Sequence, residues 1–298
     1  MGEKSIPRPF LKWAGGKTQL TNELLDHLPI EFNTYHEPFL GGGAFFFKLF
    51  RNGKIKNAHV SDLNSELVDT YFAIRDCFEE VINDLSQYPY DKEFYYKLRS
   101  QNPDEMSLSA KAARMIYLNK TGYNGLYRVN KSGFFNVPFG KHKNPKYLDE
   151  ENLKAVSIAL QQINIHNTSY EIVLDTAKQG DLVYFDPPYV PVSDTSNFTS
   201  YQSSGFSIDD QYRLRDVCVE LTRRNVYVIL SNSDTEQVRD LFSPYAFEVG
   251  EVLANRAINC NGKQRGKMTE LIITNFPVEK TVQLQLLEKQ PFFTVSIP

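Results

Sequence analysis

Short apolar runs alternate with amphipathic helical patterns along most of this chain, and this alternation restricts its fold more than any other feature. Residues 58–62 and 182–185 have the length of buried strands, and residues 226–230 form a nearly continuous apolar run. Between such runs, apolar residues recur at helical spacing, as in the stripe of Leu67, Tyr71, Ile74 and Phe78. Strands that alternate with helices predict an α/β fold with a doubly wound, mainly parallel sheet.

The same kinds of pattern predict the other elements. Ser207 followed by Asp210 has the spacing of a capping box, so we expect a helix to begin there. Further strands are expected at 35–40, 247–253 and 271–276, and further helices at 44–50, 109–119, 150–161 and 236–242.

Residues 88–148 interrupt this regular pattern and carry an excess of positive charge. Eleven Lys or Arg stand against four acids there, a net charge of +7 in a chain whose total is −3. An acidic body with a basic insert is typical of a protein that binds a polyanion, although a solvated basic face gives the same pattern. A second segment, residues 255–267, has four cations and no acid. We expect it to contact a nucleic-acid backbone through Arg256, Lys263, Arg265 and Lys267.

Composition and spacing exclude several classes of protein. The three cysteines lie far apart, which indicates neither a disulfide framework nor a zinc cluster, and the five histidines are equally scattered, so no metal is expected. The first ten residues lack the apolar core of a signal peptide, and no apolar run approaches the roughly 18 residues of a membrane span. We therefore expect a soluble, cytoplasmic protein without a membrane partner.

A glycine turn, Gly41–Gly43, follows the first predicted strand and lets a ligand approach the backbone there. A dinucleotide fingerprint would need glycine at position 46, where Phe46 stands, and Gly16-Lys17 lacks the earlier glycine of a phosphate loop. Asp62 ends the second strand, at the position where doubly wound sheets contact ribose hydroxyls. Together these features predict a nucleoside-containing ligand without a pyrophosphate, such as S-adenosylmethionine.

The segment Asp186-Pro187-Pro188-Tyr189 follows a predicted strand, so it lies at the carboxyl edge of the sheet, where such folds bind ligands. Its two prolines fix a turn and remove two backbone donors. The Asp186 carboxylate and the Pro187 carbonyl are then two acceptors beside the ring of Tyr189. This arrangement suits a planar amine such as the amino group of adenine.

These segments together resemble the signature blocks of Dam-type DNA adenine-N6 methyltransferases, the alpha group of the D12 class. The blocks are FLKWAGGK (10–17), EPFLGGG (37–43), GYNGLYR (122–128), FNVPFG (135–140) and DPPY (186–189). They occur in the order typical of that group, and the resemblance runs from about residue 9 to 276, nearly the whole chain. Within the family, LYRVN at 126–130 resembles the methylase of the DpnII system more than the housekeeping Dam enzyme.

The resemblance implies a Rossmann-like catalytic domain, residues 1–66 and 149–298, with a mainly helical DNA-recognition domain, residues 67–148, inserted into it. It implies S-adenosylmethionine as cofactor, with S-adenosylhomocysteine as product. The catalytic residues would be Asp186, Pro187, Pro188 and Tyr189. Cofactor contacts would come from Trp13, Lys17, Glu37, Phe39, Gly41, Gly43, Asp62 and Asp186. DNA contacts would come from Lys12, Asn124, Leu126, Arg128 and Pro138.

The expected reaction is methyl transfer to N6 of an adenine flipped out of duplex DNA, with GATC as the expected target. A cognate restriction endonuclease, acting on the same site without direct contact, is a second expected partner. Two alternatives remain open from the residues: a methyltransferase for RNA or a protein amide with the same chemistry, and a DNA-binding module without catalysis. The basic insert favours duplex DNA over the first, and the intact segment 186–189 opposes the second.

Overall fold

The computed structural model describes residues 6–13, 20–189, 206–255 and 267–278. Backbone contacts divide the chain into two compact units, which are described separately below. The first comprises Met1–Thr18 and Thr34–Thr176, and the second comprises Gln19–Asn33 and Ala177–Pro298. Of the seven strands in the described residues, three belong to the first unit and four to the second.

The first unit contains a parallel sheet with the strand order β3-β2-β1. Glu37 pairs with Val60 in this register, and Asp62 pairs with Asn167. The first strand is shorter than predicted because Pro38 has no N–H with which to continue the ladder. The strands are β1 (Tyr35–Glu37), β2 (Ala58–Asp62) and β3 (Ile163–Asn167), of which β3 was not predicted.

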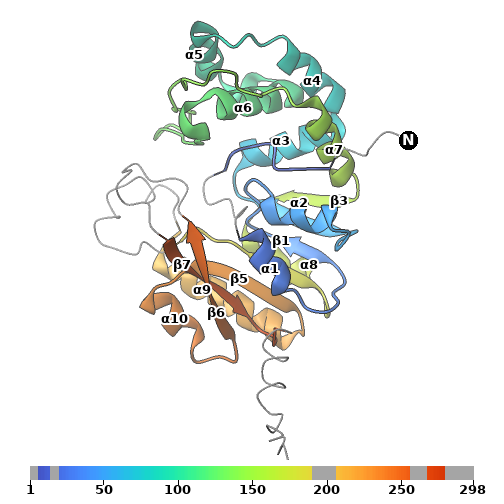
Figure 1. The fold of residues 1–298 in the computed structure, drawn as a ribbon, viewed down its shortest axis with the longest axis vertical. Helices are drawn as coiled ribbons and strands as arrows, with labels where there is room; N and C mark the ends of the chain where they lie inside the picture. Colours follow the sequence, from blue (N-terminus) through green and yellow to red (C-terminus); the bar gives the residue numbers. More distant parts are fainter. Residues whose placement is uncertain (1–5, 14–19, 190–205, 256–266, 279–298) are drawn as a thin grey trace, which may run out of the picture. The chain divides into compact units, whose positions relative to one another are not determined.

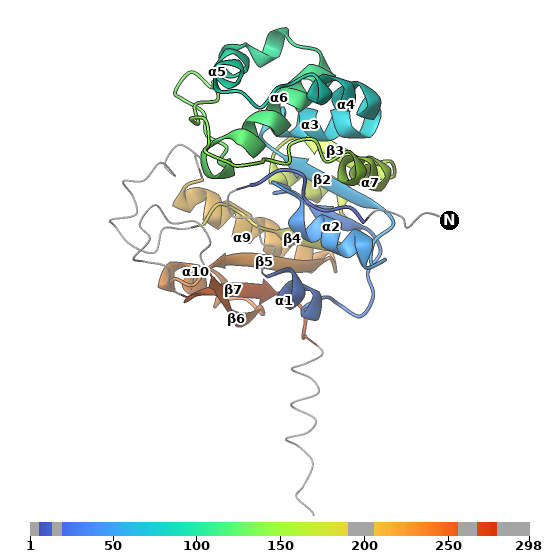
Figure 2. The same ribbon diagram turned by 45° about the horizontal axis from the view of Figure 1, so that its top comes forward.

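Helices make up most of the rest of the first unit. Both ribbon views show α3, α4 and α6 side by side (Figures 1 and 2), and these helices carry the buried side chains of Tyr71, Ile74, Val81 and Tyr117. The predicted stripe is wrong at its last residue, because the non-helical backbone of Cys77 ends α3 and Phe78 begins α4. The helices are α2 (Ala44–Arg51), α3 (Ser65–Asp76), α4 (Phe78–Ser86), α5 (Lys92–Ser100), α6 (Leu108–Thr121), α7 (Glu150–Leu160) and α8 (Val173–Thr176).

Residues 122–148 of this unit are mostly irregular, as the sequence predicts. Two antiparallel bridges, Gly122 with Phe139 and Val129 with Phe135, close the segment into a long loop, here called the hairpin loop (residues 122–140). Short 3₁₀ turns occur at Pro103–Glu105, Tyr123–Gly125 and Tyr170–Ile172.

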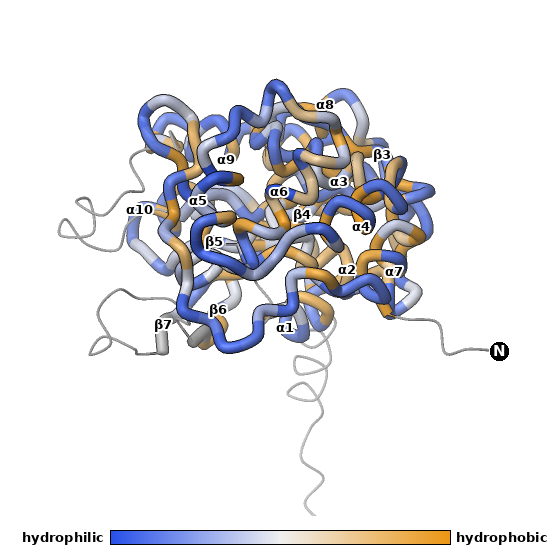
Figure 3. Tube along the Cα trace, turned by 90° about the horizontal axis from the view of Figure 1, so that it is seen from above, coloured by the Kyte–Doolittle hydropathy of each residue, from blue (hydrophilic) through white to orange (hydrophobic). Residues whose placement is uncertain are grey.

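The second unit has the strand order β4-β5-β7-β6, with β4 parallel to β5 and β7 antiparallel to both of its neighbours. All residues of β4 are buried, and three of the four, Leu182, Val183 and Phe185, are apolar (Figure 3 colours the chain by hydropathy). The capping box of Ser207 and Asp210 is confirmed at the start of α9. The strands are β4 (Leu182–Phe185), β5 (Tyr227–Ser233), β6 (Glu248–Asn255) and β7 (Lys267–Thr274), and the helices are α1 (Thr21–Asp26), α9 (Ile208–Arg223) and α10 (Glu236–Phe242).

The expected α/β class with mainly parallel strands is thus confirmed. The boundaries expected for the two domains, at residues 66–67 and 148–149, stay a prediction. Among the residues that the structure describes, no helix has the length and apolarity needed to span a membrane.

Candidate active site and DNA interface

Asp186 follows β4 directly, at the carboxyl end of a buried parallel strand. Phe185 pairs in register with Leu230 of β5, so Asp186 comes to lie beside Ser231. The Ser231 hydroxyl donates a hydrogen bond to Asp186 Oδ1 at 3.0 Å, and the Tyr184 hydroxyl lies 3.0 Å from Ser231 Oγ. Ser231 has only one proton to donate, so Tyr184 must be the donor in that second bond. A buried chain of two hydroxyls therefore fixes one oxygen of the Asp186 carboxylate.

The two proline carbonyls after Asp186 differ in their hydrogen bonding. The Pro188 carbonyl accepts a hydrogen bond from the buried Gln211 side chain at 3.2 Å, and Asn232 in turn donates to Gln211 at 3.1 Å. The Pro187 carbonyl accepts no hydrogen bond within the described ranges of the chain. Since buried carbonyls normally have a partner, the Pro187 carbonyl is the one that can accept a hydrogen bond from a ligand.

Tyr189 is half-buried, and its hydroxyl donates a hydrogen bond to Glu270 Oε2 on β7 at 2.7 Å. Burial raises the pKa of this hydroxyl well above its ordinary value, and the negative charges of Asp186 and Glu270 raise it further. The hydroxyl therefore stays protonated and continues to donate. A hydrogen bond at this end of the side chain restrains the ring plane, as a stacking role would require.

The glycine turn after β1 needs glycine at two of its positions. Gly41 has φ +49° and Gly43 has φ +65°, in the left-handed region that other residues rarely adopt. The Trp13 ring covers Gly41 so closely that a Cβ there would lie 2.7 Å from Trp13 Cδ1. The Tyr71 hydroxyl donates to the Gly41 carbonyl at 3.0 Å. The turn thus holds Trp13 beside the N-terminus of α2.

Asp62 ends β2 and closes this turn from the other side. Its Oδ2 accepts the N–H of Gly41 and its Oδ1 accepts the N–H of Asn64, both at 2.9 Å. Burial raises the pKa of the Asp62 carboxyl, and the two backbone hydrogen bonds limit this rise. Each carboxylate oxygen can accept more than one hydrogen bond, so Asp62 keeps capacity for a ligand hydroxyl.

Two more predicted cofactor residues lie in this turn region. Glu37 is buried at the end of β1, where its Oε2 accepts a 2.6 Å hydrogen bond from the Tyr35 hydroxyl. The Phe39 ring stacks against Tyr170 with 5.3 Å between the ring centroids. The structure therefore gathers six of the predicted cofactor residues at the ends of β1 and β2: Trp13, Glu37, Phe39, Gly41, Gly43 and Asp62.

The predicted base-contacting residues lie on the hairpin loop. Arg128 is exposed, and it donates from Nε to Asn136 Oδ1 at 2.7 Å and from Nη2 to the Asn136 carbonyl at 3.2 Å. These two bonds leave three of its five donors for a ligand, enough for a bidentate contact. Asn124 and Pro138 are also exposed, and Leu126 is half-buried. The loop therefore presents a guanidinium whose direction is already fixed.

Lys12 is exposed at its side chain, but its backbone is held on both sides by Asn119. The Lys12 N–H donates to Asn119 Oδ1 and Asn119 Nδ2 donates to the Lys12 carbonyl, each at 2.8 Å. Gly125, at φ +63°, lies against the Lys12 side chain so closely that a Cβ would collide with it. Lys12 is thereby placed next to the hairpin loop.

Part of the positive charge in residues 88–148 is neutralised inside the unit. Arg114, 1% exposed, pairs with Glu66 at 2.5 Å, and Lys111 pairs with Asp69 at 3.1 Å.

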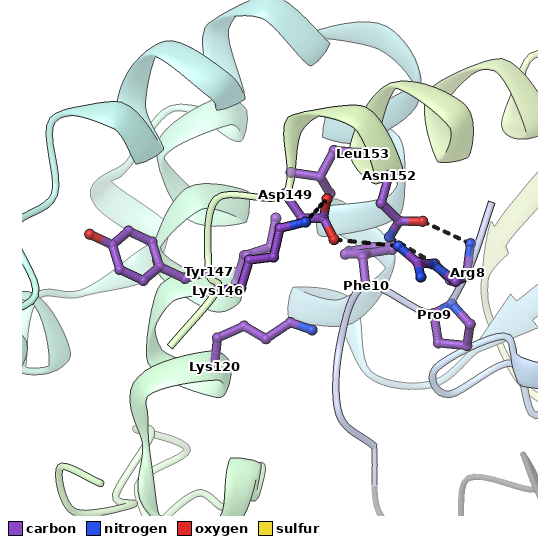
Figure 4. Close-up of a pocket in the computed structure, with 10 residues that line it drawn as sticks. Arg8, Pro9, Phe10, Lys120, Lys146, Tyr147, Asp149, Asn152 and Leu153 are labelled. Atoms are coloured by element: carbon purple, nitrogen blue, oxygen red, sulfur yellow. Dashed lines mark hydrogen bonds and ion pairs between the residues drawn. The ribbon is translucent and has the colours of Figure 1, made fainter. Parts of the chain in front are cut away.

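Other cations line a cavity of about 410 Å³ into which Lys120 extends (Figure 4). Burial, and then the nearby charge of Lys12, lower the pKa of Lys120. None of the predicted site residues lines this cavity.

The family model of D12 class N6 adenine-specific DNA methyltransferases matches residues 13–258 of the chain. This range includes the glycine turn, Asp62, the hairpin loop and Asp186–Tyr189. The chain belongs to this family. The expected enzyme class is thereby confirmed, and this DNA adenine-N6 methyltransferase can be compared with its relatives.

Three relatives span nearly the whole methyltransferase. It is 42% identical over 277 residues to Type II methyltransferase M1.LlaDCHI of Lactococcus lactis subsp. cremoris, covering 90% of this chain and 95% of that protein. It is 41% identical over 288 residues to Type II methyltransferase M.MjaIII of Methanocaldococcus jannaschii, covering 90% and 99%. A DNA adenine methylase of Vibrio cholerae is 36% identical over 270 residues, covering 89% and 95%.

Several predicted contacts of the methyltransferase lie outside the described residues: Lys17, Arg256, Lys263 and Arg265. Lys267 opens β7. Most of the residues that hold the site in place carry little signal in the sequence. Ser231 had a weak signal, since it directly follows the apolar run 226–230, and Tyr127 lies within the GYNGLYR block. The others had none: Gln211, Glu270, Glu66 and Asn119.

Proposed function

We propose that this methyltransferase transfers the methyl group of S-adenosylmethionine to N6 of the adenine in GATC, after that base has been flipped out of duplex DNA. The observation that carries the proposal is the pair of acceptors at the end of β4. Asp186 is anchored through one oxygen by Ser231, and the adjacent Pro187 carbonyl accepts no hydrogen bond from the described residues. The amino group of adenine has two N–H donors, and two neighbouring acceptors match them.

The turn region after β1 fits the nucleoside part of the cofactor. Gly41 leaves its backbone uncovered by a side chain of its own, Trp13 offers a flat ring, and Asp62 retains acceptor capacity for ribose hydroxyls. When bound, S-adenosylmethionine supplies an electrophilic methyl group on its sulfonium sulfur, and S-adenosylhomocysteine is the product.

The acceptor pair would also activate the nitrogen. The lone pair of the adenine amino group is delocalised into the ring, which makes the group planar and weakly nucleophilic. Hydrogen bonds from its two N–H groups to Asp186 and Pro187 favour a pyramidal nitrogen with a free lone pair. Holding that nitrogen in line with the methyl group supplies much of the rate enhancement.

Tyr189 would hold the flipped base. Removing a base from the duplex costs a few kcal/mol, and stacking on an aromatic side chain returns roughly 1–3 kcal/mol. The Glu270 hydrogen bond restrains the ring before the base arrives, so less conformational freedom is lost on binding.

The hairpin loop supports the choice of GATC and of residues 67–148 as the recognition domain. Arg128 has a fixed guanidinium with donors to spare for guanine O6 and N7, and Leu126 can contact the methyl group of thymine. Two of the relatives are named Type II methyltransferases, which supports a cognate restriction endonuclease acting on the same site.

A protection assay tests the proposal. Plasmid incubated with the enzyme and S-adenosylmethionine should become resistant to a nuclease that is blocked by methyl-adenine in GATC. Tritiated methyl transfer to two duplexes that differ only in that one adenine provides the matched control, and only the GATC duplex should be labelled. Labelled plasmid that is still cleaved would disprove GATC while keeping the adenine chemistry, and label on neither duplex would disprove both.

A further inference from the structure

Tyr127 lies between the two predicted base-contacting residues Leu126 and Arg128, yet its own side chain is engaged elsewhere. Its ring stacks on Trp13, with 4.9 Å between the ring centroids and 25° between the planes. Its hydroxyl donates a hydrogen bond to Glu66 Oε2 at 3.0 Å. One residue of the hairpin loop therefore contacts the ring that covers the glycine turn.

The acceptor of the Tyr127 hydroxyl is itself rigidly held. Glu66 lies in the first turn of α3, where a negative charge is favourable, and its other oxygen pairs with Arg114. Arg114 is almost fully buried, and it also donates to the backbone carbonyls of Leu98 and Arg99 at 3.2 and 3.1 Å. Burial raises the pKa of the Tyr127 hydroxyl and the Glu66 charge raises it further, so the hydroxyl remains a donor.

A second link runs parallel to the first. Asn119 is completely buried and pairs with both backbone groups of Lys12, and its Nδ2 also donates to the Gly125 carbonyl at 3.2 Å. The segment Lys12–Trp13 and the segment Gly125–Tyr127 are thus joined at two successive points. A displacement of the Trp13 ring must move Tyr127 or break the stack.

We propose that Tyr127 is a positioning residue that couples cofactor binding to base recognition. The ring of Tyr127 transmits the position of Trp13, at the cofactor side, to Arg128, at the DNA side. This inference rests on the proposed function for the cofactor role of Trp13 and the guanine contact of Arg128. Coupling between two ligands is reciprocal, so cognate DNA must tighten cofactor binding by the same factor as cofactor tightens DNA binding.

The test is a thermodynamic cycle with S-adenosylhomocysteine as the probe, because it does not react. Its Kd is measured by calorimetry with the free enzyme and with the enzyme saturated by a GATC duplex. For the natural chain we expect the duplex to tighten binding of S-adenosylhomocysteine by about 5-fold or more, which is the lower end of the usual range of coupling between two binding sites. Tyr127→Phe keeps the stack and should keep most of that ratio, whereas Tyr127→Ala should bring the ratio close to 1. Tyr212→Ala, which removes an exposed aromatic on α9 of the other unit, is the matched control and should keep the full ratio.

Trp13 provides a second readout, because it is the only tryptophan in the chain. Addition of GATC duplex without cofactor should change Trp13 fluorescence in the natural chain and in Tyr127→Phe, but much less in Tyr127→Ala. A purely structural role of Tyr127 would change the melting temperature without changing the Kd ratio or this response. Should Tyr127→Ala fail to fold, Tyr127→Leu retains the volume without the ring and serves in its place.

The outcomes separate the two proposals. A ratio that is unchanged in Tyr127→Ala, or a ratio of 1 in the natural chain, overturns the coupling role. Failure of the natural chain to bind S-adenosylhomocysteine at all overturns the proposed cofactor, and with it the basis of the coupling. A ratio that falls in Tyr212→Ala as much as in Tyr127→Ala also counts against a specific role.

Discussion

The proposed catalytic segment in the second unit and the proposed recognition residues in the first unit are built in opposite ways. Asp186–Tyr189 is one contiguous motif at the end of one strand, and its supports lie on the packed elements α9, β5 and β7. In the first unit, Trp13, Asp62 and Arg128 are far apart in sequence. Asp62 and Trp13 both contact Gly41, and Asn119 and Tyr127 join the Lys12–Trp13 segment to the hairpin loop that carries Arg128. Loss of one residue from a contiguous motif removes a group that the reaction needs, whereas loss of one residue from a distributed network first weakens the positioning of the others. Loss of Asp186 should therefore reduce turnover most, and loss of Arg128 should mainly change specificity.

The largest effect is expected for Asp186→Ala. The variant loses one of the two proposed acceptors for the adenine amino group and leaves the Ser231 hydroxyl without its acceptor. We therefore expect kcat to fall by roughly 10²–10³-fold or more, as when one polar group is removed from other preorganised sites. Binding of duplex DNA should change little, because phosphate contacts supply most of that affinity. Tritiated methyl transfer and filter binding measure the two quantities.

Asp209→Ala is the matched control, since it removes an exposed carboxylate on α9 and should leave the rate unchanged. Near-normal turnover in Asp186→Ala would show that the chemistry is not confined to the compact motif, and the contrast between the two units would fail.

Tyr189→Ala should have the next largest effect. Stacking on one base is worth about 1–3 kcal/mol, so kcat/KM should fall roughly 5- to 150-fold. Tyr189→Phe keeps the ring and loses only the hydrogen bond to Glu270, so its loss should be much smaller. Steady-state kinetics on a GATC duplex distinguish the two. Equal losses would assign the role to the hydroxyl and to Glu270, which the sequence motif alone does not indicate.

The same contrast explains how much of the fold the sequence could predict. The buried strand Leu182–Phe185 and the capped helix Ile208–Arg223 follow from local patterns, and the structure confirms both. Cys77 could not be foreseen as a break, because the apolar stripe continues across it to Phe78. Helix Lys92–Ser100 was missed because its tyrosines and cations mask a short apolar face.

The candidate site likewise has one part that the sequence predicts and one part that it does not. A motif such as Asp186–Tyr189 can be found from sequence because its chemistry is contained in adjacent residues. The partners of Asp186, Pro188 and Tyr189 are 45, 23 and 81 residues away in the sequence, and Asn119 is 107 residues from Lys12. Such pairs depend on packing, and no local pattern records them.

Arg128→Ala should change specificity more than rate. Loss of a bidentate guanine contact costs about 1–3 kcal/mol of discrimination, so the preference for GATC over a site with that guanine replaced should shrink by roughly 5- to 150-fold. Lys131→Ala, at an exposed position of the same loop, is the control and should leave the preference intact. The measurement is kcat/KM on a set of duplexes with one substitution each. An equal decrease on every duplex would instead indicate a phosphate contact.

The smallest effect expected is a pH dependence of stability that belongs to the first unit. His36, His59 and His166 form a column across β1, β2 and β3, with His59 Nδ1 and His166 Nε2 3.2 Å apart. Two imidazoles share such a hydrogen bond only if one of these nitrogens is unprotonated. Burial lowers the pKa of His166 from its ordinary value of 6.5, so the folded state favours the neutral ring.

The sign of the effect follows from that lowered pKa. The contribution of His166 to the free energy of unfolding is complete above the ordinary pKa of about 6.5, where the ring is neutral in the unfolded chain too. It is lost as the pH falls through the lower pKa of the folded state. The melting temperature of the natural protein should therefore drop between pH 7.5 and pH 5 by more than that of His166→Asn. His27→Asn, which changes a half-buried histidine after α1 in the second unit, should keep the natural pH dependence. If His27→Asn rather than His166→Asn reduced the pH dependence, the titrating group would lie in the second unit, and the histidine column would have no part in it.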